Sequence, residues 1–382
     1  MKKIGILTQP LIRNYGGILQ AYALQLVLKR MGNEVLIIDM HYKKNWFLES
    51  FKSTIKVILN SFGLKLNQKQ FIINPNLKEF NEIYKNNVLF INKNINKTKR
   101  INCIKNYSDI AEYGFEAVIV GSDQVWRPEF SPNMPNYFLD FLKDIEGVKR
   151  ISYAASFGVD YWKFTETETK NYTKLLQDFD AVSVREDSAI ELCKKNMYVN
   201  ATLVLDPTLL LSVDDYEKLI DKEECSVHNN SLFCYVLDDA PEKKAIIDFL
   251  STELNLVPNL IDMKIKYKNI NKIDLEKSIF PTIGSWISGF RNSEFVVTDS
   301  FHGMVFSILF NKPFIVIGNI DRGISRFISL LKLLKLESRL IYSLKELTTD
   351  KINEPIDYFS VNEIMLKEKK KSFAFIEAAI SK

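Results

Sequence analysis

The segment from Phe295 to Ile317, FVVTDSFHGMVFSILFNKPFIVI, limits the fold of this chain more than any other. It begins with a short apolar run that is typical of a buried parallel strand. Asp299 and Ser300 then offer N-cap side chains to a run with helical spacing, and Pro313 ends that run before a second apolar stretch. The pattern predicts a strand–helix–strand unit of an α/β protein.

His302 lies in the first turn of this predicted helix, between Phe301 and Gly303. The N–H groups at a helix start favour an anionic ligand, and a histidine exchanges protons near neutral pH. Ligands of open α/β sheets bind at the carboxyl ends of the strands, which is where this turn falls. We therefore predict a functional role for His302, although a histidine packed under a loop is the ordinary alternative.

Composition excludes several classes of protein. The 382 residues are enough for two domains, and a net charge of +4 is too small to indicate nucleic-acid binding. The four scattered cysteines predict buried thiols in a reducing compartment, and no cluster has the spacing of a metal site. The N-terminus resembles a strand rather than a signal peptide, and no apolar run is long enough to span a bilayer. We expect a cytoplasmic protein.

A βαβ unit is predicted at the N-terminus, with strands at 3–8 and 34–39 around a helix at 18–31. The loop before that helix lacks the GxGxxG dinucleotide motif. Its polar character suits a ligand such as a sugar, and a simple tight turn is the alternative. The candidate residues of this loop and the following turn are Asn14, Tyr15, Gly16, Gly17 and Gln20.

Two further predicted strands end in polar residues. Ser122, Asp123 and Trp126 follow the strand at 116–120. Asp123 could accept sugar hydroxyls and Trp126 could stack on a sugar, or the tryptophan could belong to the core. Arg185 follows the strand at 181–184 and suits a carboxylate or phosphate, with a surface ion pair as the alternative.

The remaining features concern domain boundaries and charge. An Asp-Pro pair at 206–207 suggests a junction, so we expect domains at 1–200 and 201–358 and a separate helix at 359–382. Arg322 and Arg326 could hold an anion or belong to a solvated loop. Residues 42–64 form a basic, amphipathic stretch that could lie on an anionic membrane or pack on its own domain.

Six segments in order resemble the polysaccharide pyruvyl transferase family: NYGGILQAYALQ, AVIVGSDQVWRP, RISYAASFG, VSVRE, LDPTLLL and VVTDSFHGMVFSILFNKPFI. The resemblance implies two Rossmann-like domains facing across a cleft in a GT-B-like arrangement, with the last helix packing back on the first domain. It implies an acceptor site in the first domain and a donor site in the second. The implied reaction moves the enolpyruvyl unit of phosphoenolpyruvate to a sugar of a bacterial surface polysaccharide or its lipid-linked precursor, which forms a pyruvate ketal without a further cofactor.

The resemblance also implies roles for single residues. His302 and Arg185 match family positions associated with phosphoenolpyruvate, and His302 would act as general acid or base with Asp123 facing the acceptor. Ser300 stands where several members have arginine, so we expect Arg322 or Arg326 to supply that charge. A lipid-linked acceptor would bring the protein to the inner face of the membrane. A nucleotide-sugar glycosyltransferase and a non-catalytic glycan-binding relative are the alternatives.

Overall fold

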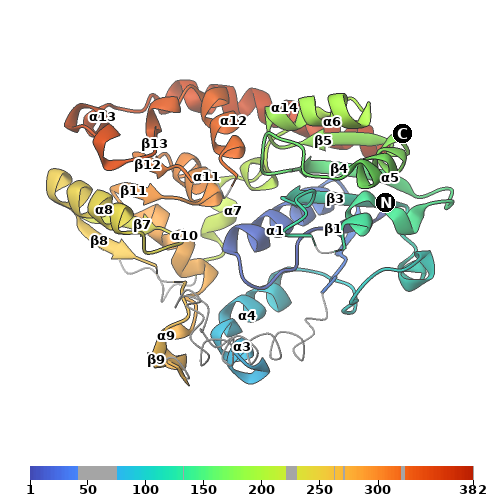
Figure 1. The fold of residues 1–382 in the computed structure, drawn as a ribbon, viewed down its shortest axis with the longest axis horizontal. Coiled ribbons are helices and arrows are strands. Elements are labelled where there is room, and N and C mark those ends of the chain that lie inside the picture. The colour runs from blue at the N-terminus through green and yellow to red at the C-terminus, as the bar shows by residue number, and fades with distance from the viewer. Residues whose placement is uncertain are drawn as a thin grey trace, which may run out of the picture.

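The computed structural model describes residues 1–41, 75–131, 133–220, 230–261, 263–269, 272–319 and 323–381. The amphipathic stretch at 42–64 and Arg322 lie outside these residues. Two parallel sheets stand side by side with helices packed around them, which confirms the α/β class (Figure 1).

The first sheet has the strand order β2-β1-β3-β4-β5-β6, and all its strand pairs are parallel. Its central strand, β3, is buried along its whole length, as expected for an apolar run covered by helices on both faces. Its strands are β1 (Lys3–Leu7), β2 (Glu34–Ile37), β3 (Ala117–Asp123), β4 (Lys149–Ala155), β5 (Ala181–Val184) and β6 (Thr202–Leu203). The helices of this half are α1 (Tyr15–Arg30), α3 (Leu77–Ile83), α4 (Lys85–Asn94), α5 (Glu166–Gln177) and α6 (Asp187–Met197).

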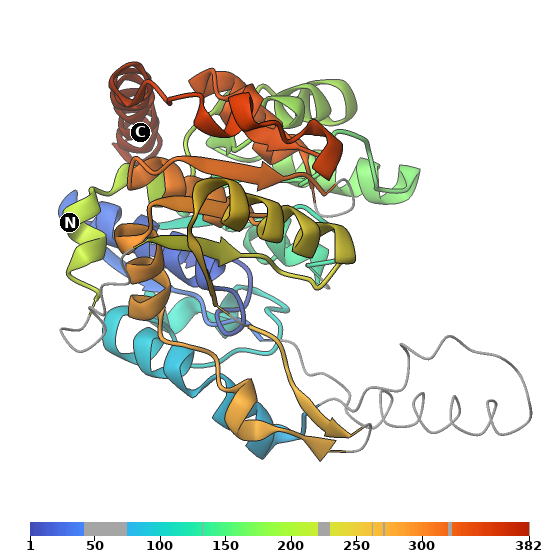
Figure 2. The ribbon, with the colours of Figure 1, turned by 90° about the vertical axis from the view of Figure 1, so that its left-hand side faces the viewer.

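The second sheet has the order β13-β12-β11-β7-β8 and is also parallel. Its strands are β7 (Ser231–Tyr235), β8 (Val257–Leu260), β11 (Phe295–Thr298), β12 (Phe314–Ile317) and β13 (Leu340–Ile341). The helices of this half are α7 (Val213–Glu217), α8 (Pro241–Leu254), α10 (Ile283–Asn292), α11 (Phe301–Leu309), α12 (Ser325–Leu334) and α13 (Thr349–Asn353). An antiparallel pair, β9 (Tyr267–Asn269) and β10 (Lys272–Ile273), projects with α9 (Leu275–Ser278) toward α3 (Figure 2).

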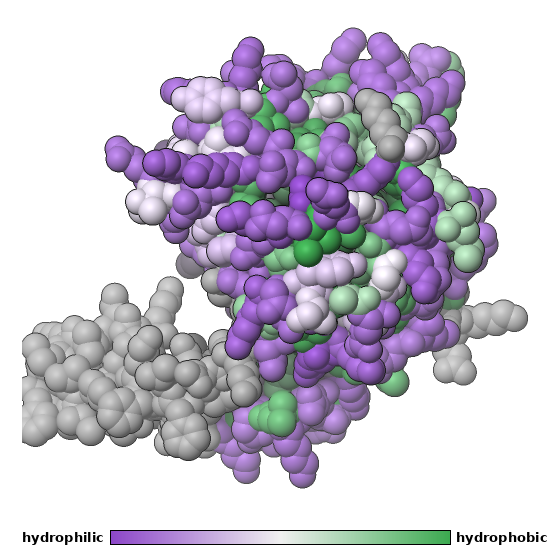
Figure 3. Space-filling model, turned by 90° about the vertical axis from the view of Figure 1, so that its right-hand side faces the viewer, coloured by the Kyte–Doolittle hydropathy of each residue, from purple (hydrophilic) through white to green (hydrophobic). Residues whose placement is uncertain are grey.

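The last helix, α14 (Tyr358–Ser381), returns from the second half to the first. The Ile380 carbonyl accepts hydrogen bonds from Lys2 and Lys149, and the Ser372 hydroxyl accepts one from the Leu205 N–H at 3.0 Å. The helix therefore packs back on the first domain. No helix in the described ranges is both long and apolar enough to cross a membrane. The side of the molecule that carries the first domain is mostly hydrophilic (Figure 3).

The two halves share a core and several polar contacts. Ile18 of α1 and Met304 of α11 belong to one hydrophobic cluster, because helices of both halves bury their apolar faces against each other. Arg30 of α1 donates hydrogen bonds from both terminal guanidinium nitrogens to the carboxylate of Asp215 in α7, at 2.9 and 2.6 Å. The carboxyl ends of β3 and β5 are thereby brought to face the start of α11.

Three of the cysteines lie in the described residues. Cys193 and Cys234 are buried, and burial raises the pKa of each thiol to about 12. Cys103 is exposed, so the expectation of buried thiols is wrong for that residue.

Candidate active site

Arg185 is the centre of a buried charged cluster between the two domains. It follows β5, and its side chain is only 2% exposed. Its Nη1 donates to Asp206 Oδ2 at 2.7 Å, and its Nη2 donates to Asp123 Oδ1 at 3.1 Å. Burial alone would lower its pKa, but the two carboxylates outweigh that effect and raise it. Arg185 is therefore a fixed cation, held from the interior rather than in a surface ion pair.

Asp123, the last residue of β3, carries the second charge of the cluster. Its Oδ1 lies 3.9 Å from Nη1 of Arg326, in addition to the contact with Arg185. Burial would raise the pKa of this carboxyl, but Arg185, His302 and Arg326 together lower it below its usual value. Asp123 is therefore ionised at neutral pH, with its negative charge facing the start of α11.

Arg326 brings a second guanidinium to the cluster from the first turn of α12. Its Nε donates to the Gly323 carbonyl at 3.2 Å. Its guanidinium lies 5.3 Å from the centre of the Phe301 ring, and that of Arg185 lies 4.6 Å from the same ring. Burial and the neighbouring Arg185 lower the pKa of Arg326 to about 10, so it keeps its charge at neutral pH. Of the two arginines expected to act in place of Ser300, the structure thus places Arg326 in the cluster.

His302 enters the cluster from α11. Ser300 caps this helix, since its Oγ accepts the Gly303 N–H at 3.4 Å. His302 is 4% exposed, and its Nε2 lies 3.7 Å from Asp206 Oδ2, with no hydrogen-bond partner among the described residues. The ring rests on Gly16 of the first domain, because a Cβ at Gly16 would lie 2.1 Å from the His302 Nδ1.

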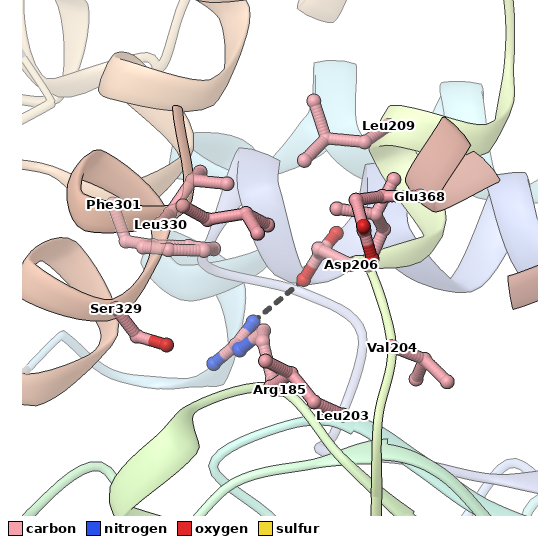
Figure 4. Close-up of a pocket in the computed structure, with 11 residues that line it drawn as sticks. Arg185, Leu203, Val204, Asp206, Leu209, Phe301, Ser329, Leu330 and Glu368 are labelled. Carbon is pink, nitrogen blue, oxygen red and sulfur yellow. Dashed lines mark hydrogen bonds and ion pairs between the residues drawn. The ribbon is translucent and has the colours of Figure 1, made fainter. Parts of the chain in front are cut away.

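Asp206, which the sequence pattern indicates only as part of a domain junction, belongs to the cluster. Its side chain is fully buried, and its Oδ1 accepts from the Thr208 N–H at 3.0 Å and the Thr208 Oγ at 2.6 Å. Its Oδ2 accepts from Arg185 (Figure 4). The same oxygen accepts from the Ser122 Oγ at 3.3 Å. Burial opposes ionisation, but His302 and Arg185 lower its pKa. A buried carboxylate in the apolar run LVLDPTLLL was the available signal, because such a group needs cationic partners.

Glu186 fixes the loop that follows β4, beside the cluster. Its Oε1 accepts from the Ser156 Oγ at 2.9 Å and from the N–H groups of Phe157 and Gly158 at 2.9 and 3.1 Å. Burial raises its pKa. The second domain reaches this loop, because a Cβ at Gly323 would lie 2.3 Å from the Gly158 carbonyl oxygen.

A small cavity lies beside Arg185, lined also by Asp206, Phe301, Ser329 and Glu368 (Figure 4). Its volume of about 20 Å³ is room for about one water molecule. Arg185 and Asp206 are the two charged residues of the cluster that line this cavity. Within the described residues, no group of histidine, cysteine and carboxylate side chains could hold a metal ion.

The structure places the side chains of two expected acceptor residues, both in the first two turns of α1, in the interior. Tyr15 is fully buried and its hydroxyl donates to the Pro281 carbonyl at 2.5 Å. Gln20 is also buried. Its amide donates to the Thr8 Oγ at 2.8 Å and the Gly17 carbonyl at 2.9 Å, and its Oε1 accepts the Ser122 N–H at 3.0 Å. Gln20 therefore joins α1 to β1 and β3.

The structure also places Ser122 and Trp126 in the interior. Ser122 is fully buried and donates to the Ala154 carbonyl at 2.9 Å. Trp126 is fully buried, donates its indole N–H to the Tyr137 carbonyl at 3.0 Å and stacks on Phe138 with ring centres 5.5 Å apart. The chain after β3 turns inward, because a tryptophan with a bonded N–H stabilises the core by burying a large apolar area.

Asn14 and Gly17 border the cluster without entering it. Asn14 is exposed, and its Oδ1 accepts the Gly16 N–H at 3.0 Å, which starts α1. A Cβ at Gly17 would lie 3.7 Å from the Asp123 Oδ2, at an ordinary contact distance. Of the loop residues predicted to bind the acceptor, Asn14 alone has an exposed side chain.

Comparisons with known proteins give a family and a fold. The model of the polysaccharide pyruvyl transferase family matches residues 14–322. None of the curated proteins compared with the chain matches it. A putative UDP-N-acetylglucosamine 2-epimerase from Listeria monocytogenes is similar in structure, with 12% identity, 99% of this chain and 95% of the other covered, and a TM-score of 0.50.

A UDP-N-acetylglucosamine 2-epimerase from Rickettsia bellii has 11% identity, coverage of 99% and 96%, and a TM-score of 0.50. An alpha-glucosyltransferase in complex with UDP has 10% identity, coverage of 99% and 96%, and a TM-score of 0.46. At such identities the similarity to the two epimerases concerns the fold alone. They agree with two Rossmann-like domains in a GT-B-like arrangement, so the expected fold class is confirmed.

Proposed function

The chain belongs to the polysaccharide pyruvyl transferase family, and from this premise we propose that it transfers the enolpyruvyl unit of phosphoenolpyruvate to a sugar of a bacterial surface polysaccharide or its lipid-linked precursor. The product would be a pyruvate ketal across two hydroxyls. The observation that carries the proposal is the buried cluster in which His302 meets two arginines and two carboxylates at the strand ends.

The two guanidinium groups of the cluster suit a donor with two anionic groups. Phosphoenolpyruvate carries a phosphate and a carboxylate, and guanidinium groups bind both through paired hydrogen bonds. Arg185 uses its two terminal nitrogens for Asp206 and Asp123, while its Nε has no partner among the described residues. Arg326 adds a second cation over the same Phe301 ring, which offsets the serine at position 300.

Protonated His302 would serve as the general acid. It gives a proton to the methylene carbon of the donor, and positive charge develops at the carbon that bears the carboxylate and the phosphate. A sugar hydroxyl attacks that carbon and passes its proton to Asp123. The C–O bond to phosphate then breaks, the second hydroxyl closes the ketal, and its proton leaves with the phosphate. General acid catalysis of this kind contributes about a hundred- to ten-thousand-fold in rate.

Substrate entry would need the two domains to separate, because Arg185, His302 and Arg326 are buried between them. Asn14 at the start of α1 would then face the acceptor, together with Asp123. Closure would return the His302 ring to Gly16 and exclude water from the charged intermediate.

Calorimetry with phosphoenolpyruvate, and in parallel with a uridine diphosphate sugar, tests this proposal without knowledge of the acceptor. We expect saturable binding of phosphoenolpyruvate, strongly weakened in Arg326→Gln. The control variant Arg291→Gln removes an arginine that pairs with Glu217 on another surface and should bind as the wild type does. Binding of the nucleotide sugar alone would favour a glycosyltransferase, and binding of neither ligand would count against a donor site here.

His302→Gln separates binding from chemistry. This variant should still bind phosphoenolpyruvate but release no phosphate when sugar acceptors are added, with the ketal product followed by mass spectrometry. Turnover at the wild-type rate would exclude His302 as the general acid.

A further inference from the structure

We propose that Asp206, in the segment that joins the two domains, is a positioning residue that holds the His302 imidazole and the Arg185 guanidinium in their catalytic arrangement. The effect on turnover that we expect from this inference depends on the proposed function. Its structural basis is independent of the substrate, because every contact that carries it is made within the chain.

The Asp206 carboxylate has one orientation available to it. Two donors of Thr208, the N–H and the hydroxyl, hold Oδ1 at 3.0 and 2.6 Å. This fixes Oδ2 on the opposite side, where it lies 2.7 Å from Arg185 Nη1 and 3.7 Å from His302 Nε2. One oxygen is thus anchored to the junction, and the other faces two residues expected to act on the donor.

The location of Asp206 couples both domains to this carboxylate. Residues 204–212 follow β6 of the first sheet and lead toward the second sheet. Arg185 belongs to the first domain and His302 to the second, and Asp206 contacts both from the segment between them. When the domains close, one fixed charge would therefore set where the imidazole and the guanidinium come to rest.

The second effect of Asp206 is electrostatic. At 3.7 Å, Nε2 and Oδ2 are too far apart for a hydrogen bond, so the contact between the carboxylate and the imidazole is electrostatic. The other charged groups of the cluster are Asp123, Arg185 and Arg326. Asp206 would therefore position the imidazole by its charge, and the guanidinium of Arg185 by a hydrogen bond.

A merely structural role makes a different prediction, which a matched pair of variants can separate. Asp206→Asn removes the charge and keeps the shape of the side chain. Asp215→Asn is the control, since Asp215 is also an aspartate of the junction region and also holds an arginine of the first domain, Arg30, at 2.6 Å. If loss of a junction ion pair were the whole effect, both variants would lose stability alone.

The first readout is turnover with phosphoenolpyruvate at several donor concentrations. In Asp206→Asn we expect kcat to fall about a hundredfold with little change in KM, because the imidazole and the guanidinium lose the charge that sets their positions. In Asp215→Asn kcat should stay near its wild-type value.

The second readout needs no substrate. The chain has three histidines, so the His302 signal in a histidine-labelled NMR sample can be assigned by its loss in His302→Gln. The chemical shift of that signal at a fixed pH should change in Asp206→Asn and should not change in Asp215→Asn, because Asp206 lies 3.7 Å from the imidazole. An unchanged chemical shift in folded Asp206→Asn would overturn the inference.

Two further outcomes are interpretable. If Asp206→Asn fails to fold, Thr208→Val replaces it, because this variant keeps the charge but removes the 2.6 Å anchor of Oδ1. It should lower kcat more than it changes KM, and an unchanged kcat would overturn the positioning role. If the wild type neither binds nor turns over phosphoenolpyruvate, the proposed function fails, while the NMR comparison still decides the contact between Asp206 and His302.

Discussion

Replacing Gly16 with alanine tests the contact on which the closed arrangement of the two domains depends. A Cβ at this position would lie 2.1 Å from Nδ1 and 2.2 Å from Cγ of the His302 ring. Ordinary contacts between such atoms are about 3.5 Å, so the ring must move by more than about 1 Å. A displacement of this size in a catalytic group can lower the rate about a hundredfold.

Gly17→Ala is the matched control for stability. Its Cβ would meet Asn14 at 3.5 Å and Asp123 at 3.7 Å, which are ordinary contacts. Both glycines lie in α1, where alanine is favoured over glycine by about 1 kcal/mol. Overpacking typically costs about 1–3 kcal/mol. Gly17→Ala should therefore equal or exceed the wild type in stability, and Gly16→Ala should be less stable than Gly17→Ala by about 1–3 kcal/mol.

Urea unfolding measures the difference in stability, and phosphate release from phosphoenolpyruvate measures the loss of turnover. Gly16→Ala should also have a more open shape in small-angle X-ray scattering, because the ring can be relieved by separating the domains. If Gly16→Ala matched Gly17→Ala in stability and the wild type in turnover, the His302 ring could not lie against Gly16 of α1.

Three further outcomes follow from other contacts. Trp126→Ala should lower the free energy of unfolding by about 3–5 kcal/mol, measured by urea unfolding, because the ring is fully buried. Burial would raise the pKa of the Asp39 carboxyl, but the contacts with His41 and Lys97 outweigh burial and lower this pKa to about 2. The contribution of Asp39 to the free energy of unfolding is therefore complete above pH 3.8, its ordinary pKa, and is lost as the pH falls toward 2. The stability advantage of the wild type over Asp39→Asn, about 2 kcal/mol at neutral pH, should therefore disappear over that range in urea unfolding. Gly323→Ala should weaken domain closure, seen as an increased radius of gyration in scattering, because its Cβ would meet the Gly158 carbonyl oxygen at 2.3 Å and its φ is +90°.

The fold was predictable because buried parallel strands and amphipathic helices leave period-specific patterns in the sequence. The strand–helix–strand unit at Phe295–Ile317 appears as β11, α11 and β12, with Ser300 as the cap. The helix expected at 18–31 is α1, which begins three residues earlier, at Tyr15. That shift has consequences, because it turns a predicted ligand loop into the first turn of a buried helix.

The site was predictable only in part, since a sequence gives the strand end at which a polar residue lies but not the direction of its side chain. Arg185, His302 and Asp123 were singled out because they lie just after predicted strands. Arg185 pairs with Asp123, and both Arg185 and His302 lie beside Asp206. Trp126 has the same kind of position, yet its ring enters the core. The difference lies in long-range packing, which periodicity does not record.

Asp206 shows what a sequence pattern conceals most completely. Within LVLDPTLLL an aspartate before a proline is typical of a turn, and its partners lie 21 residues away at Arg185 and 96 residues away at His302. A fully buried carboxylate is tolerated only where cations and N–H groups replace its water. Here the charges that make its burial tolerable belong to the two residues expected to bind and protonate the donor. The contacts that make the burial of Asp206 tolerable are therefore the same contacts that position Arg185 and His302. A substitution that removes these contacts should lower both the stability of the junction and the activity of the site.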